Sequence, residues 1–328
     1  MIQEGCSIAM RAHEVLPPPL GTFVLVAGHR LFVDRCGTGD PAVVFLPGAG
    51  LTGLDYWPLQ QRAGTGRSAV VYDRAGTGWS DHVRLPRTAL AVTGELHELL
   101  GLLSISRAVL VGHSLGGLYA RHYANRFPDE TAGLVLLDPA HEDYDAYMPT
   151  ELTRRRQNNK AFAVLNVAVD VMMSTGVTKA ALRRVPVVRR YQTLYRDLFA
   201  REIEIADWPP DLAMALVERH VSLDWLAVGL REARKVDDLY AEVRGVGPMP
   251  DLPLVILCSM STDGFQRAVS AGQSDELTRE EIAAKFRLYT DLTATLHQAD
   301  LRPVDSGHVT LAFRDPDAVL TAISDLTG

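Results

Sequence analysis

The sequence predicts an α/β fold in which a mostly parallel sheet is flanked by helices. Short continuous apolar runs that end in glycines recur along the first half of the chain, and segments with helical apolar spacing separate them. Continuous apolar runs are typical of strands covered on both faces, as in parallel sheets. The alternation indicates βαβ units, whose right-handed crossovers bring the carboxyl ends of the strands to one edge of the sheet.

The individual elements follow in order from these patterns. Residues 22–36 alternate around Gly28, which predicts two antiparallel strands joined by a short turn. The elements expected next are strands within 42–50 and 68–81, a helix at 88–103, a strand at 107–114, a helix at 117–128 and a strand at 132–140. Pro128 is expected to end the second of these helices.

The alternation of strand and helix stops after residue 141. Helical patterns follow, and no convincing strand appears until residues 253–259. A helix at 275–296, a short strand near 298–306 and a helix at 315–326 then complete the pattern. The domains expected are therefore an N-terminal tail at 1–19, a core formed by 20–140 and 251–328, and an inserted helical cap at 141–250. The apolar and aromatic faces of this cap either cover the active edge of the sheet or pack against one another.

Composition and charge narrow the functional classes. Of the 328 residues, 47% are hydrophobic, which is enough for a large core, and the net charge is −7. Basic residues are scattered among acids, so neither nucleic acid nor an anionic membrane is expected as a partner. The three cysteines, Cys6, Cys36 and Cys258, form no CxxC pair, which argues against disulfides and structural zinc. With no secretory leader and no apolar run of the ~20 residues that span a bilayer, we expect a soluble, cytoplasmic protein.

Ser114 is the first candidate for chemistry. It lies in VLVGHSLGG, residues 109–117, between a predicted strand and a predicted helix, with Gly112 and Gly116 two residues away on each side. This GxSxG pattern at a strand-to-helix turn is the nucleophile elbow, in which a strained turn exposes the serine and the flanking positions must lack bulk. The helix N-terminus also places positive dipole character beside any oxyanion formed at the serine. We therefore predict Ser114 as a nucleophile rather than a turn serine.

His308 is the predicted base. A serine hydroxyl is inert without one, and in this class of site the histidine arrives last along the chain. His308 lies in DSGHVTL, after the last predicted strand and before the last helix, where a loop at the carboxyl edge of the sheet can deliver its ring. His113 adjoins the serine, but its side chain is expected to diverge from it and to orient or pack the elbow.

Backbone donors are predicted for an oxyanion hole. Two N–H groups are needed, one from the residue after the nucleophile, Leu115, and one from the loop after the first long strand. The segment LPGAG, residues 46–50, supplies the second, and Ala49 is the expected donor. Gly48 permits the close approach, and we expect Gly48 and His113 to lie against the substrate.

With these motifs the sequence resembles serine hydrolases of the α/β-hydrolase fold superfamily that carry a helical cap. The motifs that carry the resemblance are LPGAG at 46–50, YDRAGTGWSD at 72–81, GHSLGG at 112–117, LVLLDPAHED at 134–143 and SGH at 306–308. The resemblance implies a mostly parallel eight-stranded sheet. One departure is Pro47–Gly48 in place of the common His-Gly, which leaves the backbone donor intact and removes an imidazole that often braces the loop.

The resemblance implies an acidic residue behind His308 and leaves two candidates. In most members the acid follows the strand after the cap, which nominates Asp263, although its spacing and loop sequence depart from the common form. In other members it ends the strand after the nucleophile helix, which nominates Asp138. We favour Asp138 slightly over Asp263. A turn or helix-capping role for Asp138 before Pro139 is the competing interpretation.

Three further features of the sequence are better explained by structural roles than by ligand binding or catalysis. DRAGTGWSD lacks the pattern of a phosphate cradle and is interpreted as a strand-end turn. His141, Glu142 and Asp143 adjoin one another, and a hinge or substrate-side loop is favoured over a metal site. Cys258 is expected to be a buried, inert thiol. The sequence therefore predicts neither a metal nor a cofactor.

Together these residues predict a cofactor-independent serine hydrolase that cleaves a carboxylic ester or lactone through an acyl-enzyme. The substrate is expected to be a small to medium apolar molecule, because the cap is rich in aromatic and aliphatic residues. The serine argues against the dehalogenase and epoxide hydrolase members, whose elbow carries a carboxylate. Amide hydrolysis, carbon–carbon bond cleavage of a ketone and acyl transfer to an alcohol stay open, as does a non-catalytic ligand receptor on the same fold.

Overall fold

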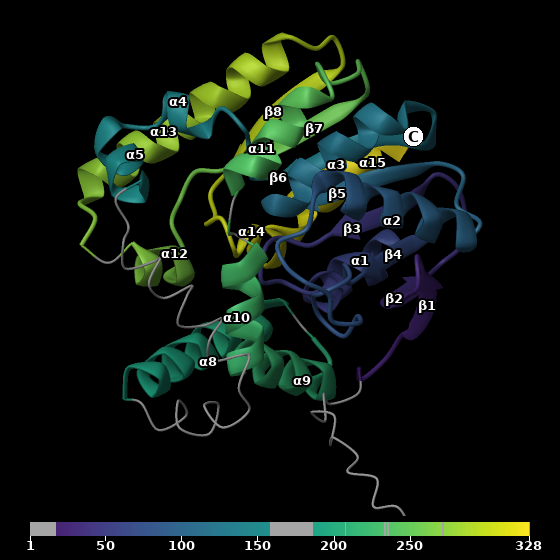
Figure 1. Cartoon of the computed structure of the whole chain (residues 1–328), viewed down its shortest axis with the longest axis horizontal. Coiled ribbons are helices and arrows are strands. Elements are labelled where there is room, and N and C mark those ends of the chain that lie inside the picture. Colours follow the sequence, from purple (N-terminus) through teal and green to yellow (C-terminus); the bar gives the residue numbers. More distant parts are fainter. Residues whose placement is uncertain are drawn as a thin grey trace, which may run out of the picture.

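An eight-stranded sheet organises the chain, with the strand order β1-β2-β4-β3-β5-β6-β7-β8 (Figure 1). The structure, a computed structural model, describes residues 18–157, 186–206, 208–232, 234, 236–270 and 272–327. The strands are β1 Thr22–Val26, β2 His29–Cys36, β3 Ala42–Leu46, β4 Ala69–Tyr72, β5 Ala108–His113, β6 Thr131–Leu137, β7 Leu254–Ser259 and β8 Ala299–Val304. Strand β2 pairs antiparallel with β1 and β4, and every other pairing is parallel. The predicted fold class is confirmed.

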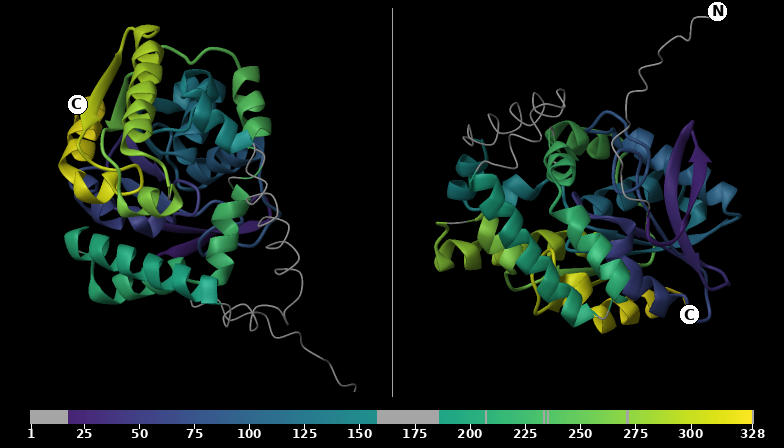
Figure 2. Two further views of the ribbon diagram at one scale, coloured as in Figure 1. Left: turned by 90° about the vertical axis from the view of Figure 1, so that its left-hand side faces the viewer. Right: turned by 90° about the horizontal axis from the view of Figure 1, so that it is seen from below.

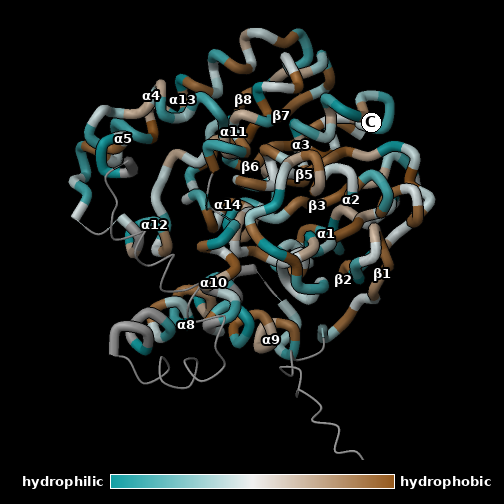
Figure 3. The backbone as a smooth tube through the Cα atoms, in the orientation of Figure 1, coloured by the Kyte–Doolittle hydropathy of each residue, from teal (hydrophilic) through white to brown (hydrophobic). Residues whose placement is uncertain are grey.

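The inner strands are apolar because both of their faces are covered. All residues of β3, β4, β5, β6 and β7 are buried, and these strands form the brown centre of Figure 3. Side chains alternate between the two faces, so Val44 and Leu46 contact one set of helices and Val43 and Phe45 the other. The outer hairpin is different, since Leu25 of β1 is 65% exposed at the edge of the sheet.

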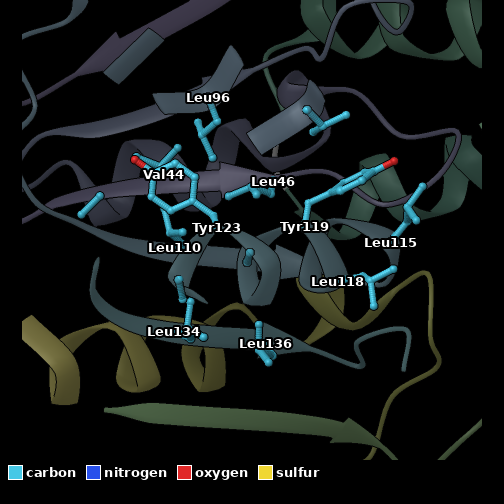
Figure 4. Packing of buried hydrophobic residues seen from close by; sticks show 14 of the residues in the cluster. Val44, Leu46, Leu96, Leu110, Leu115, Leu118, Tyr119, Tyr123, Leu134 and Leu136 are labelled. Carbon is cyan, nitrogen blue, oxygen red and sulfur yellow. The ribbon is translucent and has the colours of Figure 1, made fainter. Parts of the chain in front are cut away.

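Helices α2 and α3 pack on one face of the sheet, and α1 and α15 pack on the other. On the first face Leu96, Leu118 and Tyr123 meet the side chains of β3, β5 and β6 (Figure 4). The core helices are α1 Trp57–Ala63, α2 Ala89–Leu102, α3 Leu115–Arg126, α12 Gly264–Val269, α13 Asp275–Ala294, α14 Leu311–Arg314 and α15 Pro316–Thr327, with 3-10 turns at Gly53–Tyr56 and Pro128–Glu130. Helices α1, α12 and α14 are short, and the sequence patterns did not reveal them.

The described part of the segment between β6 and β7 is helical, as expected. It contains α4 Tyr144–Tyr147, α5 Thr150–Gln157, α8 Pro186–Ala206, α9 Pro210–His220, α10 Leu223–Glu232 and α11 Val236–Gly245. Figure 2 shows α8 and α9 as a layer beside the sheet. Residues 158–185 of the expected cap, and residues 1–17 of the expected tail with Cys6, lie outside the described residues. Among the helices that the structure describes, none has the length and apolar character to cross a membrane.

The parallel strands direct the candidate residues to one edge. Ser114 follows β5, Asp138 follows β6, and His308 lies in the loop after β8. Both Ser114 and Asp138 have positive φ angles, +51° and +44°, which non-glycine residues adopt only at an energetic cost. These two strained turns end neighbouring strands, so both candidate side chains emerge at the same edge of the sheet.

Candidate active site

The turn at Ser114 is held by hydrogen bonds and by close backbone packing. The Ser114 N–H donates to Leu137 O at 3.0 Å, and its carbonyl accepts from Ala140 N at 2.9 Å. A Cβ at position 116 would lie 2.0 Å from Leu46 O, and one at position 112 would lie 2.6 Å from Gly117 Cα. The glycines of the motif are therefore required by the approach of α3 to β3 and β5.

Gly116→Ala is expected to lower the free energy of unfolding by roughly 1–3 kcal/mol, since backbone must move to admit the methyl group. Gly101→Ala is the matched control. Gly101 is exposed near the end of α2, its Cβ would meet nothing within 4 Å, and a gain of up to about 1 kcal/mol is expected. Urea unfolding of both variants measures the difference, and equal stability of the two would contradict this packing.

Ser114, His308 and Asp138 form one hydrogen-bonded chain. His308 Nε2 lies 3.0 Å from Ser114 Oγ, and His308 Nδ1 lies 2.6 Å from Asp138 Oδ2. A carboxylate only accepts, so Nδ1–H donates to Asp138, and Nε2 of the neutral ring is left to accept the serine O–H. This tautomer is the one in which an imidazole can take a proton from Ser114.

Asp138 is buried and multiply bonded. Its Oδ1 accepts from Ser259 N–H at 3.1 Å, and Lys285 Nζ lies 2.8 Å from Oδ1 and 2.9 Å from Oδ2. Burial acts to raise the pKa of this carboxyl, but the Lys285 ammonium and His308 hold the pKa well below its ordinary value. Asp138 is thus a stable anion beside the imidazole. No motif in the sequence singles out Lys285, which lies among charged residues of the long helix α13.

Asp263, the alternative acid, contacts the loop of His308 rather than its ring. Its Oδ1 caps α12 by accepting from Gln266 N–H at 2.8 Å. Its Oδ2 accepts from Val309 N–H at 2.8 Å and Thr310 N–H at 3.3 Å. The structure therefore brings Asp138 to the imidazole and leaves Asp263 as an anchor for the backbone that follows His308.

The loop expected to form the oxyanion hole is braced from two directions. Arg74 donates to Pro47 O at 2.6 Å and to Gly48 O at 3.3 Å, and its guanidinium pairs with Glu232 at 2.7 Å. Glu232 also accepts from Gly50 N–H at 3.0 Å. Arg74 comes from DRAGTGWSD, so this segment holds the loop as well as turning the chain. The Arg74 guanidinium therefore holds the loop in place, where many members of the superfamily use the imidazole that Pro47 replaces.

Glu232→Gln is expected to lower the free energy of unfolding by about 3–5 kcal/mol, because it leaves the Arg74 guanidinium buried without its anion. Asp325→Asn is the control. It breaks the pair of Asp325 with Arg302, which is partly exposed, and should cost at most about 1 kcal/mol. Chemical unfolding of both variants measures the two costs, and a small effect of Glu232→Gln would show that the pair does not hold α10 to the loop.

The expected backbone donors flank the serine. Leu115 is the first residue of α3, so its N–H belongs to the first turn, where the helix supplies no carbonyl partner. Ala49 and Gly48 lie in the turn after β3 and line the same cavity as Ser114. A Cβ at position 48 would lie 3.2 Å from His113 Nδ1 and 3.4 Å from Ser114 Cβ, so the loop packs closely against the serine turn.

His113 connects the serine turn to the loop that carries His308. Its Nε2–H donates to the His308 carbonyl at 2.8 Å, so its Nδ1 accepts from the Tyr56 hydroxyl at 2.6 Å. Burial, together with the charge that His308 acquires, lowers the pKa of His113 to about 3. His113 stays neutral and fixes the backbone of His308. It also lines the cavity, where contact with substrate stays a prediction.

A cavity of about 630 Å³ opens beside Ser114 and His308. Aromatic side chains form one part of its wall, and they come from α8, α10 and α12: Tyr195, Phe199, Trp225 and Phe265. Polar side chains of α4 and α13 form another part, among them Tyr144 and Glu281, which are joined by a 2.8 Å hydrogen bond. Trp225 Nε1 donates to Gly50 O at 2.7 Å, which ties the insertion to the loop at the cavity.

The acidic side chains of residues 141–143, considered above as metal ligands, form ion pairs with arginines. Ligand atoms of His141, Glu142 and Asp143 lie within 4.8 Å of one another. However, both terminal nitrogens of Arg121 bond Glu142 at 2.8 Å, and Arg244 lies 3.2 Å from Asp143. A metal ion would have to displace these cations, so the contacts favour a structural link between α3 and α11.

Known proteins resemble this chain in sequence and in fold. Residues 43–322 match the model of the Alpha/beta hydrolase family. The chain belongs to this family. An uncharacterized protein of Mycobacterium bovis, Mb2734, is 29% identical over 154 residues, which are 47% of this chain and 45% of that protein. The alignment thus spans less than half the length of this relative.

Solved structures of similar fold cover almost the whole chain. The wild-type Cfl2 structure from Burkholderia cenocepacia has a TM-score of 0.64 at 18% identity and covers 93% of this chain and 95% of that chain. An enol-lactonase from Burkholderia xenovorans LB400 has a TM-score of 0.59 at 19% identity, over 93% and 98% of the two chains. At these identities the likeness shows the fold.

Proposed function

We propose that the protein is a cofactor-independent serine hydrolase that cleaves a carboxylic ester or lactone through an acyl-enzyme. The observation that carries the proposal is the continuous chain from Ser114 Oγ through His308 to Asp138, with links of 3.0 Å and 2.6 Å. This chain opens into a cavity large enough for a medium-sized molecule. The helical insertion, proposed as a cap over residues 141–250, supplies aromatic walls to that cavity.

The proposed reaction starts when Ser114 Oγ attacks the acyl carbon and His308 Nε2 takes its proton. The tetrahedral intermediate collapses, the bond to the leaving oxygen breaks, and the imidazolium returns the proton to the departing alcohol. Water then attacks the acyl-enzyme with His308 as base, which releases the carboxylic acid and restores Ser114. Asp138 stabilises the imidazolium in both halves of the reaction.

Backbone N–H groups of Ala49 and Leu115 are proposed to stabilise the oxyanion. Ala49 lines the cavity beside Ser114, and Leu115, the residue after the serine, adds the positive end of the α3 dipole. The bracing of residues 47–50 by Arg74 and Glu232 supports this role, because an oxyanion donor is effective only when it is held in place beforehand.

A small to medium apolar ester or lactone is the proposed substrate. Aromatic side chains from α8, α10 and α12 form an apolar wall, and the volume of about 630 Å³ lies within the usual range for small-molecule sites. Because one protein of similar fold is an enol-lactonase, the substrate screen should include lactones as well as open-chain esters. The screen should grade both classes by acyl size.

The direct test is turnover of an activated ester, combined with labelling by a serine-directed phosphonate and mass spectrometry of the modified peptide. Hydrolysis and a single adduct on Ser114 are expected. Absence of both turnover and adduct would refute the enzyme proposal and favour a ligand receptor on this fold. Amide substrates, ketones and added alcohol acceptors, run in parallel, separate ester hydrolysis from related acyl chemistry.

A further inference from the structure

Lys285 is a buried cation that the proposed reaction does not use. It lies in the middle of α13, is 7% exposed, and places Nζ 2.8 Å and 2.9 Å from the two carboxylate oxygens of Asp138. The same Nζ donates to Ser259 Oγ at 2.6 Å. A serine hydrolase needs only the imidazole on its acid, whereas here the carboxylate faces an imidazole and an ammonium together.

Burying the Lys285 ammonium costs free energy unless an opposite charge lies beside it. Removing an ion from water costs several kcal/mol even after relaxation, so a buried lysine is retained where it neutralises a specific charge. Asp138 is itself 2% exposed, and its other titratable partner is His308, the ring that has to accept the serine proton in the proposed reaction. Without Lys285 the carboxylate would be a buried anion with hydrogen bonds but no counter-charge.

We propose that Lys285 is a positioning residue for the hydrolysis proposed above, which keeps Asp138 ionised and fixes the carboxylate in the orientation that receives His308 Nδ1–H. The inference rests on that proposed function. Lys285 acts through Asp138 and does not enter the proton transfers. Ser259 takes part by holding the ammonium through its hydroxyl and the carboxylate through its N–H.

The other titratable groups that face Asp138 are uncharged at neutral pH. Burial raises the pKa of Cys258 to about 12 and the pKa values of Tyr144 and Tyr289 well above their ordinary range. Burial lowers the pKa of His113 to about 3. These groups come from β7, α4, α13 and β5. His308 faces Asp138 from the loop after β8 as the proton acceptor of the proposed reaction. Among the described groups around Asp138, Lys285 is therefore the basic side chain that contacts both carboxylate oxygens.

The sign of the pH effect follows from this arrangement. Lys285 holds the pKa of Asp138 below its ordinary value, and burial acts in the opposite direction. When the cation is removed, burial dominates and the carboxyl takes a proton at a higher pH. A protonated Asp138 cannot stabilise an imidazolium, so activity should disappear at a higher pH on the acid side.

The test compares Lys285→Met with Lys285→Arg and with Arg287→Met, which removes an exposed cation from the same helix. With an activated ester, Lys285→Met is expected to lower kcat about 10–100-fold with KM changed less than about threefold, and to move the acid limb of kcat upward by about one pH unit or more. Lys285→Arg should restore most of kcat and the limb, and Arg287→Met should match the unaltered protein. A raised KM with an unmoved acid limb would instead place Lys285 on the substrate and overturn the proposal.

A second variant and a second measurement keep the test decisive if Lys285→Met does not fold. Lys285→Gln removes the charge and keeps N–H donors on a side chain that is one atom shorter, so the same shift of the acid limb is expected. Proton NMR of the low-field His308 Nδ1–H resonance, assigned by its loss in Asp138→Asn, reports the contact with Asp138 without any turnover. If the unaltered protein neither hydrolyses the ester nor labels at Ser114, the proposed function fails. A resonance with the same pH dependence in Lys285→Gln and the unaltered protein would overturn the role of Lys285.

Discussion

Ser114→Ala is expected to lower kcat/KM for an activated carboxylic ester by at least about 10⁴-fold. The substitution removes the oxygen that forms the acyl-enzyme and leaves the oxyanion donors and the cavity unchanged. Because the ring that lies 3.0 Å from Ser114 Oγ is already held by Asp138, loss of the hydroxyl should not disturb His308. The variant should therefore fold and bind substrate but fail to turn it over.

Steady-state kinetics and phosphonate labelling of the variant measure this effect. Ser261→Ala is the control, since Ser261 lies on the loop after β7 and contacts Asp305, outside the hydrogen-bonded chain of Ser114. It should retain activity and label normally. Should Ser114→Ala keep more than about a tenth of the activity, or still form an adduct, another nucleophile would be at work.

The fold and two members of the proposed triad could be predicted from local sequence. A continuous apolar strand, glycines two residues on each side of a serine and a following helix are determined by neighbouring residues, so GHSLGG in this setting nominates Ser114 as the nucleophile. His308 required only the order of elements, because a loop after the last strand must lie at the same edge of the sheet. The same reasoning predicted Leu115 and Ala49 as donors.

The acid could not be chosen from sequence because both aspartates follow strands of the same parallel sheet. Strands β6 and β7 are neighbours, so Asp138 and Asp263 both approach the loop of His308. What separates them is side-chain direction. Asp138 turns toward the ring at a positive φ, whereas Asp263 faces backbone N–H groups of α12 and of Val309.

The ionic partners of Asp138 and Arg74 could not be predicted from sequence either, because they lie far away along the chain. Lys285 lies 147 residues from Asp138, and Glu232 lies 158 residues from Arg74. Each belongs to an amphipathic helix in which a charged residue normally faces solvent. Its burial depends on how α13 and α10 pack against the sheet edge, which no local pattern specifies.

Asp138→Asn is expected to lower kcat about 10³–10⁴-fold, because the amide stabilises no imidazolium and favours the wrong tautomer of His308. Asp263→Asn is the matched comparison. It weakens the contacts to Val309 and Thr310, so reduced stability and a fall in kcat of less than about tenfold are expected. If only Asp263→Asn lowered kcat by tenfold or more, Asp263 would be the acid, and if neither did, the proposed triad would be wrong.

The double variant Asp138→Asn/Lys285→Met separates lost chemistry from lost stability. Asp138→Asn alone leaves the Lys285 ammonium buried without its anion, a defect that can destabilise the protein by several kcal/mol and lower activity indirectly. Removal of both charges takes away this defect, so the double variant should recover much of the free energy of unfolding. Its kcat should stay as low as that of Asp138→Asn, since no carboxylate remains to hold the imidazolium. Recovery of kcat together with stability would mean that Asp138 supports the fold and that His308 works without it.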